Sequence, residues 1–345
     1  MNEPDYQPNV SLEQIAADLK GETCRSVLLT THAKPDGDAL GSVAALAEAL
    51  VRCGRAVECR VMPPVPRNLR FLMGPGQWVV HDEHTPPPAV EPDRIIVVDT
   101  GARSQLQPLI DWIEARRDRV IVIDHHLHGD DIAARRFVDG QAAAACEIVA
   151  DLVDALGVPV DEAMGQALFT GIASDTGWFR FSNVRGKTHR LAARLLELGI
   201  DHSDLYARTE QGERPEKLAL MTRALASTRL IADGRAAVMS LRESDFADTG
   251  ARPDETERFV DLPQAVSDVQ VVALLVEQGE LTRLSLRSKP GDDAVDVNQL
   301  AQQFGGGGHA RAAGAKVDQP LSTIESRLIE AIIQVLSGQA SDTAP

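Results

Sequence analysis

The sequence predicts a two-domain α/β protein, with a doubly wound parallel sheet in the N-terminal half and a smaller domain with a mixed sheet after it. Short apolar runs alternate with helical patterns up to about residue 200, which is typical of parallel sheets covered by helices. A second α/β pattern begins near Arg229, and 345 residues with 43% hydrophobic content can bury two cores. We therefore expect domains over residues 1–200 and 229–345, joined by a charged helical connector over 201–228.

The elements of the first domain follow from the spacing of its apolar residues. Strands are expected where apolar runs are short, and helices where apolar residues recur at intervals of three and four. We expect strands over residues 26–32, 57–62, 94–99 and 119–124, and helices over residues 11–20, 39–53, 106–117, 141–156, 161–173 and 187–198. Residues 63–92 are rich in proline and are expected to form a loop with short pieces of structure.

The second domain has fewer and less regular elements. The helical connector is expected to break at Arg214-Pro215. We expect strands over residues 236–241, 269–276 and 281–287, a helix over 295–304 and a final packed helix over 321–336. Residues 337–345 are expected to be disordered.

Carboxylate and imidazole side chains stand where the predicted strands of the first domain end. Open α/β sheets place their ligands at this edge. The candidate metal ligands are His32, Asp36, Asp38, Asp99, His125 and Asp175. Two divalent ions about 3.5–4 Å apart need roughly this many ligands, with positions left open for water and substrate. Oxygen donors with a few imidazoles suit Mn²⁺ or Mg²⁺ better than structural Zn²⁺.

Each of these motifs alone has a plainer interpretation. An isolated Asp-Gly-Asp, as at residues 36–38, is most often a turn, and a His-His pair at a strand end is often structural. Together with Asp99 and Asp175, however, a purely structural role would leave carboxylates that repel each other. The combination therefore favours a metal site.

The second domain contains a candidate phosphate site. Four consecutive glycines before His309 imply a close backbone approach, and successive N–H groups of such a loop form a nest suited to phosphate. Arg287 and Ser288 end a predicted strand, where a guanidinium could bind the same anion. The candidate substrate contacts are Arg287, Ser288, Gly306, Gly307, Gly308, His309 and Arg311.

Five motifs, taken in order, resemble one known family. They are His32-Ala-Lys-Pro-Asp-Gly-Asp, Val98-Asp-Thr, Asp124-His-His, Ser174-Asp-Thr and Gly305-Gly-Gly-Gly-His. This series is similar to the DHH phosphoesterase superfamily with a C-terminal DHHA1 domain, from about residue 27 to about residue 316. The compact length and the stretch after Asp175 resemble the NrnA-type enzymes, which are bifunctional oligoribonucleases and 3′-phosphoadenosine 5′-phosphate (pAp) phosphatases.

The resemblance implies roles for the candidate residues. One ion would be held by His32, Asp36 and Asp99, and the other by Asp38, Asp99, His125 and Asp175, with Asp99 bridging. Mn²⁺ is the first choice, with Mg²⁺ or Co²⁺ as alternatives. Asp124 is expected to orient a histidine rather than bind metal, and His126 to face the scissile phosphate as hydrogen-bond donor or general acid. The second domain is expected to bind the phosphate or nucleotide end of the substrate.

Composition limits the partners. A net charge of −16 argues against a protein that binds long nucleic acid, duplexes included, and 4% aromatic residues provide no stacking platform for a long strand. Composition therefore favours a substrate of one to a few nucleotides, and the resemblance to the family implies short RNA oligonucleotides, linear dinucleotides such as pApA or pGpG, and pAp. Family members often pair, so we expect a homodimer. Cysteines without metal-like spacing, a polar N-terminus and no membrane-length apolar run predict a cytoplasmic protein without membrane contact.

Three other functions stay open. A manganese-dependent inorganic pyrophosphatase resembles the N-terminal half, but the glycine run of residues 305–308 argues against it. A RecJ-like single-strand exonuclease shares both domains, but its added nucleic-acid-binding parts are missing from so short and acidic a chain. A nucleotide sensor that has lost turnover is disfavoured because all the ligand positions are intact.

Overall fold

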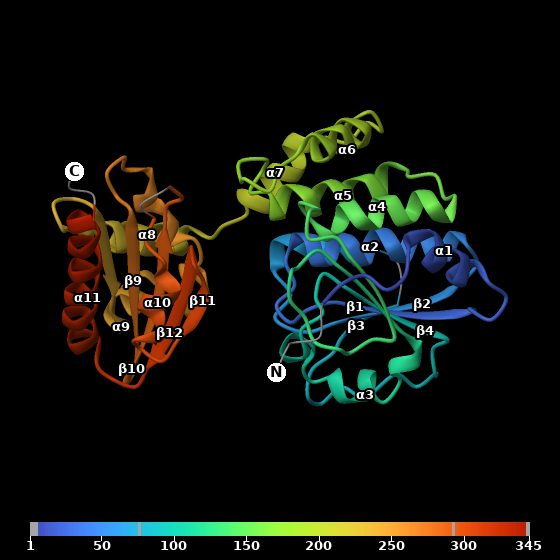
Figure 1. The fold of residues 1–345 in the computed structure, drawn as a ribbon, viewed down its shortest axis with the longest axis horizontal. Helices are drawn as coiled ribbons and strands as arrows, with labels where there is room; N and C mark the ends of the chain where they lie inside the picture. Colours follow the sequence, from blue (N-terminus) through green and yellow to red (C-terminus); the bar gives the residue numbers. More distant parts are fainter. Residues whose placement is uncertain (1–5, 75–76, 292–293, 343–345) are drawn as a thin grey trace. The chain divides into compact units, whose positions relative to one another are not determined.

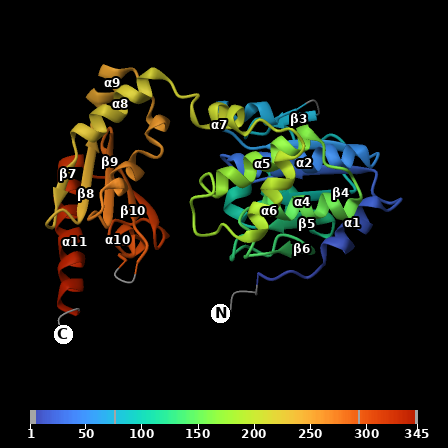
Figure 2. The ribbon, with the colours of Figure 1, turned by 90° about the horizontal axis from the view of Figure 1, so that it is seen from above.

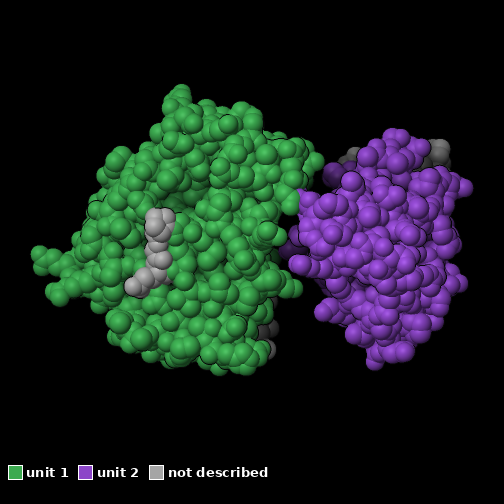
Figure 3. All heavy atoms as spheres, turned by 180° about the vertical axis from the view of Figure 1, so that it is seen from behind, with its two compact units in different colours: residues 1–212 green, residues 213–345 purple. Residues whose placement is uncertain are grey.

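The computed structural model describes residues 6–74, 77–291 and 294–342. The chain forms two compact units, residues 1–212 and 213–345, which Figure 3 shows in green and purple. Each unit contains one six-stranded sheet. None of the helices in the described ranges combines the length and hydropathy that a membrane span requires.

The sheet of the first unit is entirely parallel, in the order β3-β2-β1-β4-β5-β6 (Figure 1). Its strands are β1 (Ser26–Thr30), β2 (Ala56–Val61), β3 (Gln77–Val80), β4 (Arg94–Val98), β5 (Val120–Asp124) and β6 (Arg135–Val138). The strand order reverses between β1 and β4, where Leu28 lies opposite Ile95. The predicted doubly wound parallel sheet is confirmed, and its switch point lies between these two strands.

Helices cover both faces of this sheet. The helices of this unit are α1 (Leu12–Lys20), α2 (Gly37–Arg52), α3 (Ile110–Glu114), α4 (Ala145–Leu156), α5 (Glu162–Asp175), α6 (Gly186–Leu196) and α7 (His202–Glu210), with 3₁₀ turns η1 (Arg67–Leu72), η2 (Arg103–Leu106) and η3 (Arg117–Arg119). In Figure 1, α1, α2, α4 and α5 lie over one face and α3 lies on the other, and Figure 2 shows the first group from above. Leu29 packs in the core beneath the four helices and Leu28 in the core beside α3. Burial on both faces explains why the central strands are continuous apolar runs.

Glycines bring α2 and α5 close together. A Cβ on Gly37 would lie 2.6 Å from the Cβ of Ser174, and one on Gly41 would overlap the carbonyl oxygen of Ala167. Gly37 is the first residue of α2. It therefore permits close helix packing.

The second unit is built on a mixed sheet in the order β11-β12-β10-β9-β8-β7. Its strands are β7 (Arg229–Ile231), β8 (Ala236–Leu241), β9 (Val271–Gln278), β10 (Leu281–Ser288), β11 (Gly307–His309) and β12 (Ala312–Val317). Its helices are α8 (Pro215–Ala226), α9 (Glu243–Thr249), α10 (Val297–Gln302) and α11 (Leu321–Asp342), with 3₁₀ turns η4 (Pro253–Thr256) and η5 (Phe259–Ala265). Strands β8 and β9 are parallel and the other neighbours antiparallel, which confirms the predicted mixed sheet.

Separate cores cover the two faces of the second sheet. Leu284 and Leu286 pack in one core with residues of α10 and α11, and Leu274 packs in the other with residues of α8 and η5. Helix α11 continues to Asp342, although disorder was expected from residue 337. The last three residues lie outside the described part of the chain.

Several elements differ from expectation. Strand β6 lies where no element was expected, whereas β3 is one of the short pieces of structure expected in the proline-rich segment. Both are four-residue edge strands that exist through pairing, β6 with β5 and β3 with β2. The single helix expected over residues 106–117 is replaced by η2, the short α3 and η3. Pro108 explains this difference, because a proline without an N–H group interrupts a continuing helix.

Candidate metal centre

All six predicted metal ligands come together at the carboxyl edge of the first sheet. They come from four segments: His32, Asp36 and Asp38 from the β1–α2 connection and the first turn of α2, Asp99 from the end of β4, His125 from the end of β5, and Asp175 from the last residue of α5. This is the edge that contains the switch point between β1 and β4.

The potential ligand atoms form overlapping groups. Within each group these atoms lie within 4.8 Å of one another, and the groups are His32, Asp36 and Asp99; Asp38, His125 and Asp175; and Asp99, His125 and His126. The Nε2 atom of His32 lies 3.4 Å from Oδ2 of Asp99, and that of His125 lies 3.3 Å from Oδ1 of the same carboxylate. Asp99 therefore presents one oxygen to each histidine.

Backbone geometry holds these side chains in place. Asp36 is the N-cap of α2, and its Oδ1 accepts hydrogen bonds from the amides of Asp38 and Ala39. Asp38 lies within the first turn, not before the helix as expected. Its carboxylate accepts the amides of Ala145 and Cys146 at 2.6 and 2.9 Å, so the N-terminus of α4 stabilises its charge.

The two ligand histidines are oriented by backbone carbonyls. Nδ1 of His32 lies 3.0 Å from the oxygen of Ala33, and Nδ1 of His125 lies 3.3 Å from that of Ala142. A proton on each Nδ1 leaves Nε2 available as a metal ligand. Asp99 has a φ of 62°, a left-handed conformation that costs energy and is concentrated at functional sites.

The cluster brings four carboxylates together, of which Asp38 and Asp99 are buried and Asp36 and Asp175 are partly exposed. Burial and the Asp99 carboxylate raise the pKa of Asp38 well above its usual range, and burial raises the pKa of Asp175 to about 6. Burial lowers the histidine pKa values, but contacts with Asp99 outweigh it and raise the pKa of His32 to about 9 and that of His125 to about 10.

A buried oxygen provides a direct test of whether a cation fits this cluster. Within the described part of the chain, Oδ1 of Asp99 is buried and accepts no hydrogen bond, although Nε2 of His125 lies 3.3 Å from it. A divalent cation would satisfy this oxygen and offset the repulsion between the carboxylates. The carboxylate and imidazole donors therefore fit a divalent metal ion.

Asp124 and His126 form a hydrogen-bonded pair beside the ligands. Asp124 is fully buried, and its Oδ1 lies 2.8 Å from Nδ1 of His126 and accepts the amides of both following histidines. The side chain of His126 is 53% exposed. Asp124 is absent from the three ligand groups, in keeping with the orienting role that remains a prediction.

Tyr6 is a residue of this site that the sequence analysis missed. Its hydroxyl donates a hydrogen bond of 2.7 Å to Oδ2 of Asp124. The available signal was an aromatic residue within an otherwise polar N-terminal segment.

The predicted phosphate contacts of the second unit are partly assembled. The amide of Ser288 donates to the carbonyl of Arg311 at 3.1 Å, and a guanidinium nitrogen of Arg311 lies 3.5 Å from the Ser288 hydroxyl. Nε of Arg287 instead lies 3.1 Å from a carboxylate oxygen of Asp261. Ser288 and Arg311 are thus neighbours, while Arg287 is paired with an acidic side chain.

The glycine run does not form the expected nest of free amides. The amides of Gly305 and Gly306 donate to the carbonyls of Gln302 and Ala301 and so close α10. Strand β11, which contains Gly307, Gly308 and the exposed His309, pairs with β12. A Cβ on Gly306 would overlap the carbonyl oxygen of Gly314. The close backbone approach is therefore to β12, and the first two amides are not available to an anion.

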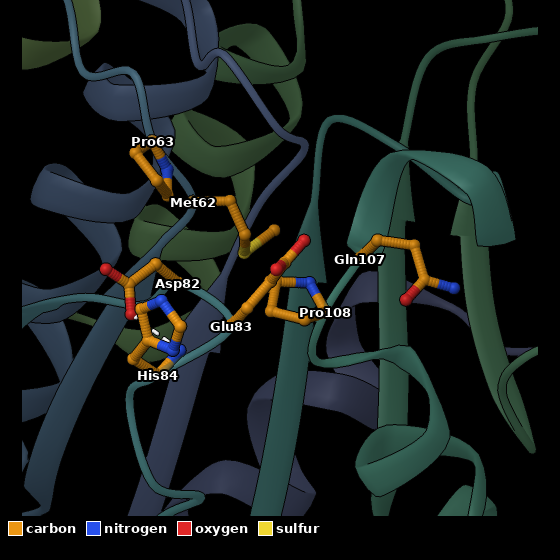
Figure 4. Close-up of a pocket in the computed structure, with 7 residues that line it drawn as sticks. All are labelled: Met62, Pro63, Asp82, Glu83, His84, Gln107 and Pro108. Carbon is orange, nitrogen blue, oxygen red and sulfur yellow. Dashed lines mark hydrogen bonds between the residues drawn. The ribbon is translucent and has the colours of Figure 1, made fainter.

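A surface hollow of about 580 Å³ lies beside the first sheet (Figure 4). Its lining residues are Met62, Pro63, Asp82, Glu83, His84, Gln107 and Pro108. The amide of His84 donates to Asp82 at 3.0 Å. None of the six candidate ligands lines this hollow, so it is distinct from the metal centre.

Comparisons with known proteins identify the family of the chain. The DHH family, N-terminal domain, matches residues 26–172, and the DHHA1 domain matches residues 233–340. The bifunctional oligoribonuclease and PAP phosphatase NrnA of Thermus thermophilus is 32% identical over 90% of this chain and 90% of its own length. The protein of the same name from Bacillus subtilis is 24% identical over 85% of this chain and 89% of its own.

Solved structures share the fold. An exopolyphosphatase-related protein from Bacteroides fragilis has a TM-score of 0.85 at 24% identity, covering 94% of this chain and 97% of its own. RecJ from Thermus thermophilus, in complex with Mn²⁺, has a TM-score of 0.56 at 17% identity, covering 99% of this chain and 56% of its own. Two family models and a relative 32% identical over nine-tenths of each chain establish that this protein belongs to the DHH family of phosphoesterases and carries its C-terminal DHHA1 domain.

Proposed function

We propose that this phosphoesterase hydrolyses short oligoribonucleotides and linear dinucleotides to mononucleotides, and pAp to AMP and phosphate. The observation that supports hydrolysis most strongly is the buried cluster around Asp99, whose Oδ1 accepts no hydrogen bond within the described part of the chain. The choice of substrates is supported by the relatives named bifunctional oligoribonuclease and PAP phosphatase, which match most of the chain.

We propose that the cluster holds two divalent cations, with Mn²⁺ preferred over Mg²⁺ or Co²⁺. The ligands of one would be His32, Asp36 and Asp99, and those of the other Asp38, Asp99, His125 and Asp175. Such a pair of ions, when bound, activates a water molecule for attack on phosphorus and neutralises charge that develops on the phosphoryl oxygens. The oxygen-rich donor set supports Mn²⁺ or Mg²⁺.

We propose that His126 faces the scissile phosphate, either as a hydrogen-bond donor or as a general acid that gives a proton to the leaving oxygen. Because Nδ1 faces Asp124, Nε2 is the ring nitrogen available to substrate. The hydrogen bond with Asp124 also raises the pKa of His126 above its usual value, which favours the protonated form that a general acid needs.

We propose that the second unit supplies contacts to the substrate. Arg311 and Ser288 are adjacent, and His309 is exposed on the edge strand β11. Arg287 would exchange its Asp261 partner for phosphate. The remaining proposed contacts are Gly306, Gly307 and Gly308, of which Gly306 could act only through atoms other than its amide hydrogen.

We also retain three proposals: a homodimer, implied by the resemblance to the family, and, from the sequence pattern, a cytoplasmic location and the division into residues 1–200, 201–228 and 229–345. The net charge of −16 supports short substrates over long nucleic acid or an anionic membrane. Sedimentation velocity tests the dimer, and a monomer at micromolar concentration would contradict it.

A substrate panel tests the proposed function. Metal-free protein is reloaded with Mn²⁺ and offered pAp, pApA, pGpG, pyrophosphate and a long single-stranded DNA. We expect AMP from pAp and mononucleotides from the dinucleotides. Turnover of pyrophosphate alone would instead identify a pyrophosphatase, processive degradation of the DNA would identify a RecJ-like exonuclease, and no turnover would favour a sensor.

A further inference from the structure

Tyr6 lies in a slot between two loops of the metal centre. The residue is 7% exposed and packs in the core beside α3. A Cβ on Gly101 would overlap its hydroxyl, and one on Gly129 would overlap its ring. These glycines follow β4 and β5, the strands that deliver Asp99 and His125. The ring therefore fits because both loops lack a side chain at the contact.

The Tyr6 hydroxyl completes the hydrogen bonding of Asp124. One carboxylate oxygen, Oδ1, accepts the amides of His125 and His126 and faces Nδ1 of the His126 ring at 2.8 Å. The other, Oδ2, accepts the Tyr6 hydroxyl at 2.7 Å. Burial and the Asp124 charge raise the pKa of Tyr6 above its usual range, so its hydroxyl stays a donor. Rotation of the fully buried carboxylate would break bonds on both sides.

The segment that carries Tyr6 is anchored independently of this hydroxyl. The amide of Asn9 donates to the carbonyl of Arg136 at 3.0 Å, and the amide of Arg136 donates to the Asn9 side chain at 2.8 Å. The Asn9 side chain also donates to the carbonyl of Ala134. Removal of the Tyr6 hydroxyl therefore leaves the attachment of this segment to β6 intact.

We infer that Tyr6 is a positioning residue for the reaction, which fixes the His126 ring through Asp124. It lies outside the matched DHH domain, which begins at residue 26. The inference rests on the proposed function, because it assumes that His126 acts on the substrate. Partners of this kind typically change activity by roughly 10–100-fold when removed.

The test compares Tyr6→Phe with Tyr206→Phe, since these are the two tyrosines of the chain. Tyr206 is 41% exposed on α7, so its variant controls for the loss of a hydroxyl elsewhere. For Mn²⁺-loaded protein acting on pAp, we expect Tyr6→Phe to lower kcat about 10-fold with KM and Mn²⁺ affinity unchanged. Tyr206→Phe should retain wild-type kcat.

A double-mutant cycle separates positioning from general stability. In a His126→Ala background, Tyr6→Phe should lower kcat less than 2-fold, because the ring that it positions is gone. An equal loss in both backgrounds, or a loss matched by Tyr206→Phe, would overturn the inference. An inactive wild type would refute the proposed function, whereas an active wild type with a fully active Tyr6→Phe would refute only the inference.

A spectroscopic measurement covers the case in which Tyr6→Phe does not fold. With 3-fluorotyrosine in Tyr206→Phe protein, Tyr6 gives a single ¹⁹F resonance. His126→Ala should shift this resonance if Asp124 links the two side chains, and an unchanged resonance would contradict the link.

Discussion

Replacement of Gly37 by alanine tests whether the close packing of α2 against α5 sets the geometry of the metal centre. The added Cβ would lie 2.6 Å from the Cβ of Ser174, which is 0.8 Å short of ordinary contact at 3.4 Å (3.4 − 2.6). A Cβ cannot rotate away from its backbone, so the helices must separate by most of that distance. We expect a loss of about 1–3 kcal/mol in unfolding free energy. The shift also moves Asp175 relative to Asp38. A displacement of about 1 Å at a reacting site can lower the catalytic rate by about 100-fold.

Gly165→Ala in α5 is the matched control. Its Cβ would lie 2.8 and 2.9 Å from the δ-methyl groups of Ile200 and Leu198, which are the free ends of flexible side chains. We expect a change in unfolding free energy within about 1 kcal/mol and unchanged activity, because those ends can rotate away. Urea unfolding and Mn²⁺-dependent kcat measure both variants. If Gly37→Ala were as stable and as active as Gly165→Ala, the packing argument would be wrong.

Four further predictions concern protonation linked to metal binding, pH-dependent stability, a helix cap and a substrate contact. Metal loading near pH 7 should release at least two protons, because the pKa values of His32 and His125 lie at about 9 and 10 in the metal-free protein and both rings must lose a proton to bind. The raised pKa of Asp38 can add to this release. Calorimetry in buffers of different ionisation enthalpy measures it, and release near zero would contradict the prediction. In the metal-free protein, the raised pKa values of His32 and His125 mean that protonation of these rings stabilises the fold. This stabilisation is complete below about pH 6.5 and is lost as the pH rises through about 9 to 10, which urea unfolding across that range checks. Asp161→Ala removes the N-cap of α5, so it should lower the unfolding free energy by about 1 kcal/mol without loss of Mn²⁺-dependent kcat. A large loss of kcat would contradict this prediction and show that the cap matters to the distant metal centre. Arg311→Ala should raise KM for pAp roughly 10-fold or more with little change in kcat, and a fall in kcat at constant KM would remove its proposed role in substrate binding.

The central strands could be predicted because continuous apolar runs in their own sequence signal that they are buried. Strands β4 and β5 are continuous apolar runs, and their observed bounds lie within one residue of those expected. The edge strands β3 and β6 have four residues each, and only their partners in the sheet make them strands. Strand β12 contains small residues with weak strand preference, and its pairing with β10 determines its conformation. Non-local pairing of this kind leaves little local pattern.

The ligand residues of the metal centre could be predicted from the sequence, whereas the contacts around them could not. Each of its candidate ligands follows a strand or stands in a short motif, so chain order alone brought them to one edge. The bond from Tyr6 to Asp124 spans 118 positions and has no local signal beyond a lone aromatic residue. The nest of free amides was predicted for the glycine run, but the Gly306 amide donates to the carbonyl of Ala301. This partner is determined by how α10 ends, which the local sequence does not show.

The most direct test of the dinuclear metal centre is a count of bound Mn²⁺. Equilibrium binding followed by electron paramagnetic resonance should show two ions per chain with a spin-coupled signal, because Asp99 presents one oxygen to each ligand histidine. Asp99→Asn, which keeps the shape and removes the charge, should lose the coupled signal while circular dichroism stays unchanged. A wild-type protein that binds one ion or none, or an Asp99→Asn variant that keeps the coupled pair, would contradict the account.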